Sequence, residues 1–318
     1  MKSDPSSEQD YSISVVIVCD YSAGHDLAWN QLRRVLAALA TQTFSDPFQV
    51  ILSESLDQKE GFPEDLLEIL PSLEVCFFPV STSYELKNHG VQQARAEWVA
   101  LLDGDCIPDR DVLRRFSEVV REEPEVVAVS GITTYPGGGL ITQVLALLDR
   151  SYLDPGRPGY NRFVCGNSPA WRRDVYLKHP LPVNAGAFAA RMQSEPLFQM
   201  GSLFWFDPEI HFEHPFHGWA MERDLRRCRG HGSILSRKLE PKIPFSWVAR
   251  LGALGVPILV AGSTLVSLRD CLRCRRHFGV RFTELPVALV LAIVVNLLEV
   301  PGMLDAIRGR TLDGTSYR

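Results

Sequence analysis

The first half of the chain alternates short, continuous apolar runs with longer stretches in which apolar residues recur at helical spacing. The runs are rich in β-branched residues and are bounded by Pro, Asp or Gly, which is typical of buried strands. We expect strands at 13–19, 48–52 and 75–80 and helices at 27–39, 64–70 and 83–96. Strands that alternate with helices predict an α/β fold with a mainly parallel sheet, in which ligands bind outside the carboxyl ends of the strands.

A fourth apolar run carries the first candidate chemistry. Residues 98–102 predict a buried strand, and Asp103-Gly104-Asp105 follows it directly. Carboxylates at a strand end can bind a divalent cation, and a glycine between them lets the backbone approach a ligand closely. Two aspartates around a glycine are more often a solvated turn. Here the motif directly follows a buried strand, and this position makes it a candidate site. A helix at 108–120 and a strand at 126–130 are expected next.

The end of the chain is more apolar than the rest. We therefore expect a disordered N-terminus at 1–11, a globular domain at 12–244 and a membrane-associated helical segment at 245–318. Within that segment, residues 251–268 carry no charge and span about 27 Å as a helix, close to the thickness of the hydrocarbon core of a bilayer. The second apolar stretch, 285–298, reaches that length only when it is extended past its end.

The positive charge between the two apolar stretches conflicts with an arrangement in which both stretches cross the bilayer. If both crossed the bilayer from a cytoplasmic domain, five arginines would lie outside, against the positive-inside tendency. These are Arg269, Arg273, Arg275, Arg276 and Arg281. Segments that lie in the membrane interface would keep the arginines beside anionic lipid headgroups. Two buried helices of a soluble domain are the remaining alternative, since the second stretch is short.

Composition and charge exclude several classes of protein. A net charge of -5 and a pI near 5.9 provide no basic surface for nucleic acid, so DNA and RNA are not expected as partners. The seven cysteines are scattered and odd in number, which predicts reduced thiols rather than a disulfide framework. Residues 1–10 are polar and contain no apolar signal core, so we expect the domain on the cytoplasmic side of a membrane.

Several segments, in order along the chain, resemble the family 2 glycosyltransferases, whose catalytic domain has the GT-A fold. The most specific part is Lys87-Asn88-His89-Gly90, followed by the strand that runs into Asp103-Gly104-Asp105. It is similar to the family's basic-Asn-x-Gly helix and its aspartate motif. Ser14-Val15-Val16-Ile17 resembles the opening strand, and 48–54 resembles the second strand, which ends in an acidic residue.

The resemblance continues to about residue 235. Cys165-Gly166-Asn167-Ser168, followed by Arg172-Arg173, is similar to the acceptor-side segment of the family. Further on, Gly201, Pro208 and His214 keep the spacing found around the last core strand.

The resemblance implies an inverting transfer of a sugar from a nucleotide-diphosphate donor. A divalent cation, Mn²⁺ or Mg²⁺, would neutralise the departing diphosphate. The apolar tail makes a lipid or a growing glycan the expected acceptor. Lys87 has a plain surface lysine as its alternative interpretation. The implied residues are donor or acceptor contacts at Glu54, Lys87, Asp103 and Asn167, and metal ligands at Asp105 and His214.

One departure from the family concerns the catalytic base. Counting back from Gly201, the family's acidic pair falls on Ala189 and Ala190, which cannot accept a proton. Glu195 is the nearest carboxylate and is therefore our predicted base. The following Pro196 disfavours helical geometry at Glu195 and would turn its side chain toward solvent. Other carboxylates lie farther along, at Asp207, Glu209 and Glu213.

The missing acidic pair motivates an alternative function, a catalytically silent homologue that binds a nucleotide sugar or scaffolds a membrane assembly. A nucleotidyltransferase would share the α/β layout and the bound metal. It normally has a Gly-rich phosphate loop near the first strand, whereas the loop after Val18 contains only Gly24. That difference counts against the nucleotidyltransferase.

Histidines form a second candidate cluster. His211, His214 and His217 recur at three-residue spacing, which would suit a metal if the segment turns. Pro215 interrupts a single helical face, so a separate zinc site is the alternative to His214 alone joining the donor metal. Arg226-Arg227 is expected on an exposed helical face, with a phosphate contact as its alternative.

Overall fold

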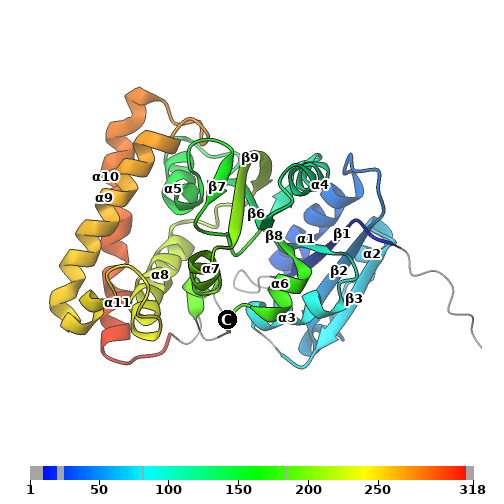
Figure 1. Ribbon diagram of the computed structural model, residues 1–318, viewed down its shortest axis with the longest axis horizontal. Coiled ribbons are helices and arrows are strands. Elements are labelled where there is room, and N and C mark those ends of the chain that lie inside the picture. The colour runs from blue at the N-terminus through cyan, green and yellow to red at the C-terminus, as the bar shows by residue number, and fades with distance from the viewer. Residues whose placement is uncertain (1–9, 20–24, 81, 184, 313–318) are drawn as a thin grey trace, which may run out of the picture.

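The computed structural model describes residues 10–312 except 20–24, 81 and 184, and most of the predicted disordered N-terminus lies outside this part of the chain. Within it, nine strands form one mixed sheet with helices on both faces (Figure 1). The path through the sheet runs β3-β2-β1-β4-β8-β6-β9-β5, and β7 pairs with β9. This arrangement confirms the predicted α/β fold.

The first half of the sheet is parallel, as the sequence predicts. β1 (Ile13–Val18) lies between β2 (Phe48–Ser55) and β4 (Trp98–Asp103), and β3 (Leu73–Phe78) pairs with the far side of β2. The carboxyl ends of β1, β2 and β4 therefore meet at one edge. The helices that connect these strands are α1 (His25–Ala40), α2 (Asp65–Ile69) and α3 (Ser83–Gln93).

The second half of the sheet contains both parallel and antiparallel strand pairs. β8 (Ala170–Arg172) joins β4 to β6 (Val126–Thr134) by antiparallel pairing, and β6 runs parallel to β9 (Leu203–Glu213). The short strands are β5 (Ile107–Pro108) and β7 (Gly159–Asn161), and the helices are α4 (Val112–Glu122), α5 (Leu140–Arg150), α6 (Arg173–Lys178) and α7 (Ala189–Gln199). The predicted helix start at Pro108 is wrong, because Pro108 pairs with Phe212 in the sheet and the helix begins at Val112.

Alternating side chains of the central strands build the core on both faces of the sheet. Ile13, Val15 and Ile17 of β1 pack with α1 and α4, whereas Val16 packs on the opposite face in the cluster that contains residues of α3, α6 and α7. Nearly every residue of β1 is apolar because both faces of this strand are covered.

The C-terminal segment packs against the rest of the chain. Its main helices are α8 (Trp219–Leu239), α9 (Val256–Cys274), α10 (Leu285–Leu298) and α11 (Val300–Ile307). α9 and α10 lie side by side along one flank of the molecule, next to α5 (Figure 1). Residues of α5, α9 and α10 share one buried apolar cluster. By length and composition alone, Ser246–Cys274 and Phe282–Ile307 could cross a membrane.

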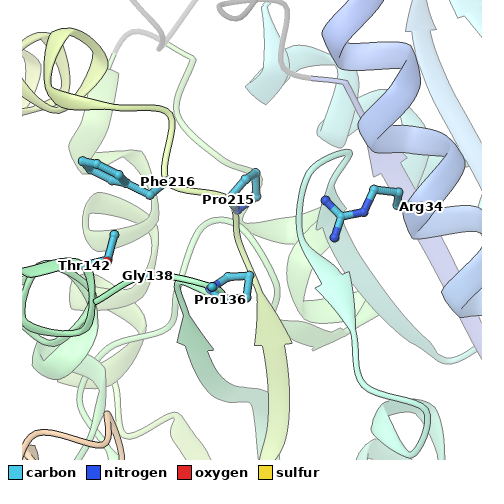
Figure 2. A pocket seen from close by; sticks show the side chains of 7 residues that line it. Arg34, Pro136, Gly138, Thr142, Pro215 and Phe216 are labelled. Atoms are coloured by element: carbon cyan, nitrogen blue, oxygen red, sulfur yellow. The ribbon is translucent and has the colours of Figure 1, made fainter. Parts of the chain in front are cut away.

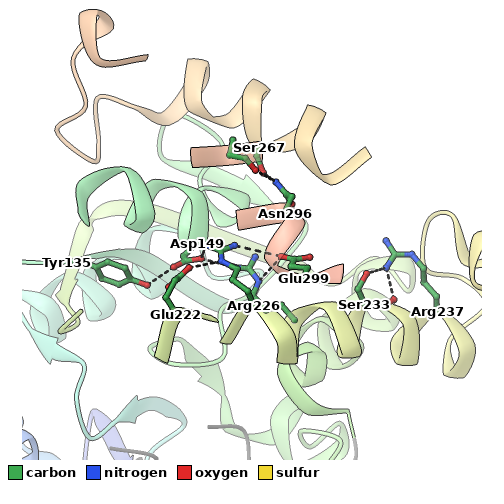
Figure 3. Close-up of polar contacts among 11 residues, drawn as sticks. Tyr135, Asp149, Glu222, Arg226, Ser233, Arg237, Ser267, Asn296 and Glu299 are labelled. Carbon is green, nitrogen blue, oxygen red and sulfur yellow. Dashed lines mark hydrogen bonds and ion pairs between the residues drawn. The ribbon is translucent and has the colours of Figure 1, made fainter. Parts of the chain in front are cut away.

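A buried polar network ties the end of the chain to α5. Arg226 of α8 pairs with Asp149 of α5, with Glu222, and more distantly with Glu299 at 3.8 Å, and Asp149 also accepts a hydrogen bond of 2.8 Å from the Tyr135 hydroxyl (Figure 3). Arg226 is 2% exposed. The prediction that Arg226-Arg227 lies on an exposed face is therefore wrong for Arg226, because this side chain turns inward to pair with Asp149 and Glu299.

Candidate functional site

The aspartate motif sits where three strand ends meet. Asp103 closes β4, its amide donates to the Asn167 carbonyl at 3.0 Å, and the Gly104 amide donates to the Val18 carbonyl at 2.7 Å. A Cβ added at Gly104 would lie 3.2 Å from the Val18 carbonyl oxygen and 3.3 Å from Cys19 Cα. Only glycine allows this close approach without a shift of the neighbouring backbone, so the turn after β4 is held tightly against the end of β1.

Lys87 links the helix motif to the aspartate motif. Its Nζ lies 2.5 Å from Asp103 Oδ1 and donates to the Gly166 carbonyl at 2.7 Å. The side chain is 2% exposed, which excludes the alternative of a plain surface lysine. The neighbouring Asn88 has a structural role instead, since its side-chain amide donates to the Leu181 carbonyl and accepts from the Tyr176 hydroxyl. Lys87, Asp103 and the 165–168 segment therefore form one contiguous wall.

Glu54 ends the neighbouring strand and is completely buried. Its Oε1 accepts from the Ser55 amide at 2.6 Å, whereas its Oε2 has no partner. Burial raises the pKa of this carboxyl to about 7, although the hydrogen bonds from Ser55 and from Cys19, the residue after β1, act in the opposite direction. A buried carboxyl with one unpartnered oxygen is unusual in a folded protein and is typical of a ligand contact.

Asp105 is the centre of the site. Its Oδ2 lies 3.2 Å from Nε2 of both His214 and His217, and its Oδ1 is buried without a partner. Burial raises the pKa of Asp105, but the two histidines and Arg150 outweigh it and lower the pKa to about 2. This carboxylate is therefore ionised at any physiological pH.

The tautomer of His214 follows from its second nitrogen. Nδ1 lies 2.8 Å from the Pro215 carbonyl oxygen, which can only accept, so Nδ1 carries the proton. In the neutral imidazole, Nε2 then presents a lone pair toward Asp105. A second hydrogen bond that fixes the orientation and tautomer of an imidazole in this way is common among metal-binding histidines.

The residues around Asp105 fit a divalent cation. The ligand atoms of Asp105, Cys106 and His214 all lie within 4.8 Å of one another. Burial raises the pKa of the Cys106 thiol well above its usual value, with the charges of Asp105 and Asp103 adding to the effect, and its Sγ accepts from the Asn167 amide at 3.3 Å. A protonated thiol is a poor ligand for a hard cation, so the carboxylate and the imidazole are the groups that suit Mn²⁺ or Mg²⁺.

The three-histidine cluster separates into two parts. His211 lies on β9 and contacts Asp109 at 2.9 Å and the Thr134 hydroxyl at 2.7 Å, while His214 and His217 both reach Asp105. The alternative of one zinc site built on all three histidines is therefore wrong. His211 lies on β9 and points toward Asp109 and Thr134, away from Asp105.

Glu195 is placed differently from our expectation. It lies inside α7 with Pro196, and it is completely buried, so the inference that Pro196 would prevent helix and expose Glu195 is wrong. Arg162 engages both carboxylate oxygens and Gln199 donates to Oε1 at 3.0 Å. Burial raises its pKa, but Arg162 and Gln199 together lower it. Ala189 and Ala190 form the start of the same helix.

An open pocket of about 470 Å³ adjoins the histidines (Figure 2). Pro215 and Phe216, which follow His214, form one wall, and residues 136–138 with Thr142 form another. Arg34 of α1 is its charged lining residue, and its side chain extends toward the pocket. None of the predicted site residues lines this pocket, so it lies beside the Asp105 centre rather than over it.

Some buried polar atoms without a partner belong to side chains that the sequence did not single out. Six buried side-chain atoms have no hydrogen-bond partner in the described part of the chain: one oxygen each of Glu54, Asp105 and Asn167, and Nε of Arg150, Arg191 and Arg237. The oxygens belong to residues predicted from the family resemblance. The arginines come from three helices far apart in sequence, and no local motif marks them.

Comparisons with known proteins define the class. The sequence profile of glycosyl transferase family 2 matches residues 14–180, more than half of the chain. The protein belongs to this family and is a glycosyltransferase. No curated protein sequence gives a match.

Solved structures show the same fold. The mannosyltransferase PcManGT from Pyrobaculum calidifontis, solved in complex with GDP-Man and Mn²⁺, is 16% identical with a TM-score of 0.53, over 91% of this chain and 88% of that one. TarS 1-349 of S. aureus, solved with UDP, is 14% identical with a TM-score of 0.49, over 95% of each chain. The likeness to PcManGT shows the GT-A fold.

Proposed function

We propose that the protein transfers a sugar from a metal-bound nucleotide-diphosphate donor to a lipid or glycan acceptor, with inversion at the anomeric carbon. The observation that carries this proposal is the Asp105 centre, where an ionised, buried carboxylate with an unpartnered oxygen faces Nε2 of His214, whose Nδ1 is bonded to the Pro215 carbonyl. At 3.2 Å, the carboxylate oxygen and Nε2 can share either a cation or a proton. The related fold with GDP-Man and Mn²⁺ favours the cation.

Each site residue has a defined task in this proposal. Asp105 and His214 hold the divalent cation, which neutralises the charge of the leaving diphosphate. Asp103, oriented by Lys87, contacts the nucleotide, and the unpartnered Oε2 of Glu54 accepts from a nucleobase N–H group. The unpartnered side-chain oxygen of Asn167 is available to the sugar or the acceptor.

The remaining role is that of the base that deprotonates the acceptor. Glu195 stays the proposed base, on the condition that its ion pair with Arg162 opens. Arg162 engages both of its oxygens and, with Gln199, lowers its pKa, whereas a general base works best with a pKa near the working pH. Glu195 can accept a proton only after Arg162 releases one oxygen. This pairing, with the alanines at 189 and 190, is the observation that favours a catalytically silent homologue as the second candidate function.

The outer face of α9 and α10 is proposed to lie on a membrane surface at the cytoplasmic side. Large apolar side chains such as Ile258, Leu265 and Val290 are exposed there, while the inner faces of both helices pack on α5. A hairpin that crossed the bilayer in this arrangement would draw the polar surface of the domain into hydrocarbon. An in-plane orientation avoids that cost and leaves the arginines of 269–281 beside lipid headgroups.

Sugar release by the purified full chain in mild detergent tests the proposal. A panel of nucleotide sugars is incubated with Mn²⁺ or with chelator, with and without a lipid-linked acceptor, and the nucleoside diphosphate formed is measured. We expect release or transfer that requires the metal. Nucleotide binding without release in the presence of every acceptor supports the silent homologue, and metal-independent release refutes the assignment of Asp105 and His214.

A further inference from the structure

The chain exposes a second apolar surface just before α9. Most of the 245–254 segment belongs to the 3₁₀ helix η5 (Ser246–Gly255). Four of its large apolar side chains are exposed, by 42% to 80% of their surface: Phe245, Trp247, Leu251 and Leu254. A single exposed apolar residue is ordinary, whereas four within ten residues indicate an interaction surface.

The inner side of the 245–254 segment is packed against the protein. Val248 is completely buried in an apolar cluster with residues of α8, α9 and α11. A Cβ added at Gly255 would lie 2.4 Å from the Val248 carbonyl oxygen, so the end of η5 is also tightly packed. The exposed side chains therefore project from a well-packed base and do not result from a loose segment.

Phe245 has an unfavourable backbone conformation. Its φ of 61° and ψ of 28° lie in the left-handed region, and it is the one non-glycine residue with positive φ in the described part of the chain. Glycine and asparagine tolerate this conformation, whereas a bulky side chain is strained there. The ring gains little from the protein in return, because it is 63% exposed. A strained residue with an exposed aromatic ring indicates that the ring has a partner outside this chain.

The charge around the segment favours one kind of partner. Lys242 and Arg250 are exposed on either side of Trp247 in the sequence, and among the described residues neither forms an ion pair. Residues 219–312 contain fifteen Arg and Lys but seven Asp and Glu, although the whole chain has a net charge of -5. Aromatic and aliphatic side chains flanked by cations suit the interface of an anionic membrane. A second copy of this surface would instead bring like charges together.

The other end of α9 carries a similar combination of side chains. Phe282 is 69% exposed, and the guanidinium of Arg275 lies 5.5 Å from the centroid of its ring. The neighbouring Arg281 is exposed as well. Between the two ends, Ile258 and Leu265 are exposed on α9. The 245–254 segment is therefore continuous with the apolar outer face of α9, and aromatic rings and cations lie at both ends of that face.

We infer that the 245–254 segment is an interfacial anchor, which inserts Phe245 and Trp247 into the headgroup region of an anionic membrane. Lys242 and Arg250 then lie beside the anionic headgroups. The inference rests on the proposed membrane association of α9 and α10, and it adds the segment and the class of lipid that hold the chain at the surface. With one anchor at each end, α9 lies in the plane of the membrane.

Flotation of the full chain with lipid vesicles tests this inference without any donor or acceptor. The vesicles contain phosphatidylcholine alone or phosphatidylcholine with phosphatidylglycerol. An aromatic variant combines Phe245→Asn with Trp247→Ser, and a charge variant combines Lys242→Gln with Arg250→Gln. The control is Leu177→Asn, which removes an exposed leucine of α6. Thermal unfolding shows that each variant is folded, and Phe245→Asn alone serves if the combined variant is not, since asparagine tolerates the left-handed conformation.

We expect the aromatic variant to lose at least tenfold in affinity for anionic vesicles and the control to bind as wild type does. The charge variant should lose about fivefold per removed cation on anionic vesicles and nothing on neutral ones. Affinity of the aromatic variant within twofold of wild type overturns the inference, and so does equal binding of wild type to both kinds of vesicle. A loss confined to Leu265→Glu with Ile293→Glu places the membrane contact on α9 and α10 alone and also overturns it. None of these readouts involves sugar transfer, so the anchor and the proposed activity fail independently.

Discussion

Glu54→Gln should make the stability of the protein less dependent on pH, because it removes a buried carboxyl whose pKa is raised. The folded state holds this pKa at about 7 instead of 4.5. A carboxyl whose pKa is higher in the folded state stabilises that state while it is protonated. This contribution to the free energy of unfolding is fully present below the unfolded pKa and is lost as the pH rises through the folded pKa. A rise from 4.5 to about 7 corresponds to about 3 kcal/mol at full ionisation, of which about 2 to 3 kcal/mol falls between pH 5 and pH 8.

The assay is thermal unfolding of wild type and Glu54→Gln in mild detergent across that range, without nucleotide or metal. Because other groups titrate alike in both proteins, the difference isolates Glu54. We expect the variant to gain roughly 5 °C over wild type between pH 5 and pH 8, given about 2 °C per kcal/mol for a chain of this size. Glu68→Gln, which removes an exposed carboxylate of α2, is the matched control.

A difference in melting temperature that stays constant with pH, or a variant less stable than wild type at pH 8, would refute the reasoning. A nucleoside diphosphate gives a second readout. If Glu54 accepts from the nucleobase, the bound ligand favours the ionised form, and the pH-dependent difference should shrink on its addition.

Three further predictions test other parts of the account. Glu195→Gln should lower transfer by about two to four powers of ten with donor binding unchanged, and full transfer activity would remove Glu195 as the base. Arg226→Met should destabilise the protein by about 3 to 5 kcal/mol in denaturant unfolding, because Asp149 and Glu222 would stay buried without their partner, and a loss below about 1 kcal/mol would contradict the network of Figure 3. Leu265→Glu combined with Ile293→Glu should reduce flotation with vesicles that contain anionic lipid, whereas Leu67→Glu, an exposed control on α2, should not; equal flotation of both would refute docking through α9 and α10.

The sequence predicts the first half of the fold well because its signals are local. Strands at 13–19 and 98–102 are continuous apolar runs, and their burial on both faces of a parallel sheet is what produces such runs. Short strands such as β5 carry no pattern of their own. Pro108 marked a helix start in the sequence, but pairing with a strand more than a hundred residues later decides its conformation.

The site likewise contains residues that local motifs predict and contacts that only the folded chain creates. Lys87, Asp103, Asp105 and Asn167 belong to contiguous motifs, and the structure brings them together at neighbouring strand ends. The contact of His217 with Asp105 depends on how the loop after β9 meets the end of β4 in space. The boundary near residue 244 stays a prediction, since α9 and α10 share a buried cluster with α5.

The most direct test of the central claim is calorimetric titration of GDP and of UDP into the full chain with and without Mn²⁺. We predict that at least one nucleotide binds in a metal-dependent way, that Asp105→Ala abolishes this dependence, and that Asp103→Asn weakens the nucleotide more than the metal. Asp174→Ala, which removes an exposed carboxylate of α6, should bind as wild type does. Metal-dependent binding that is unchanged in Asp105→Ala would contradict the account.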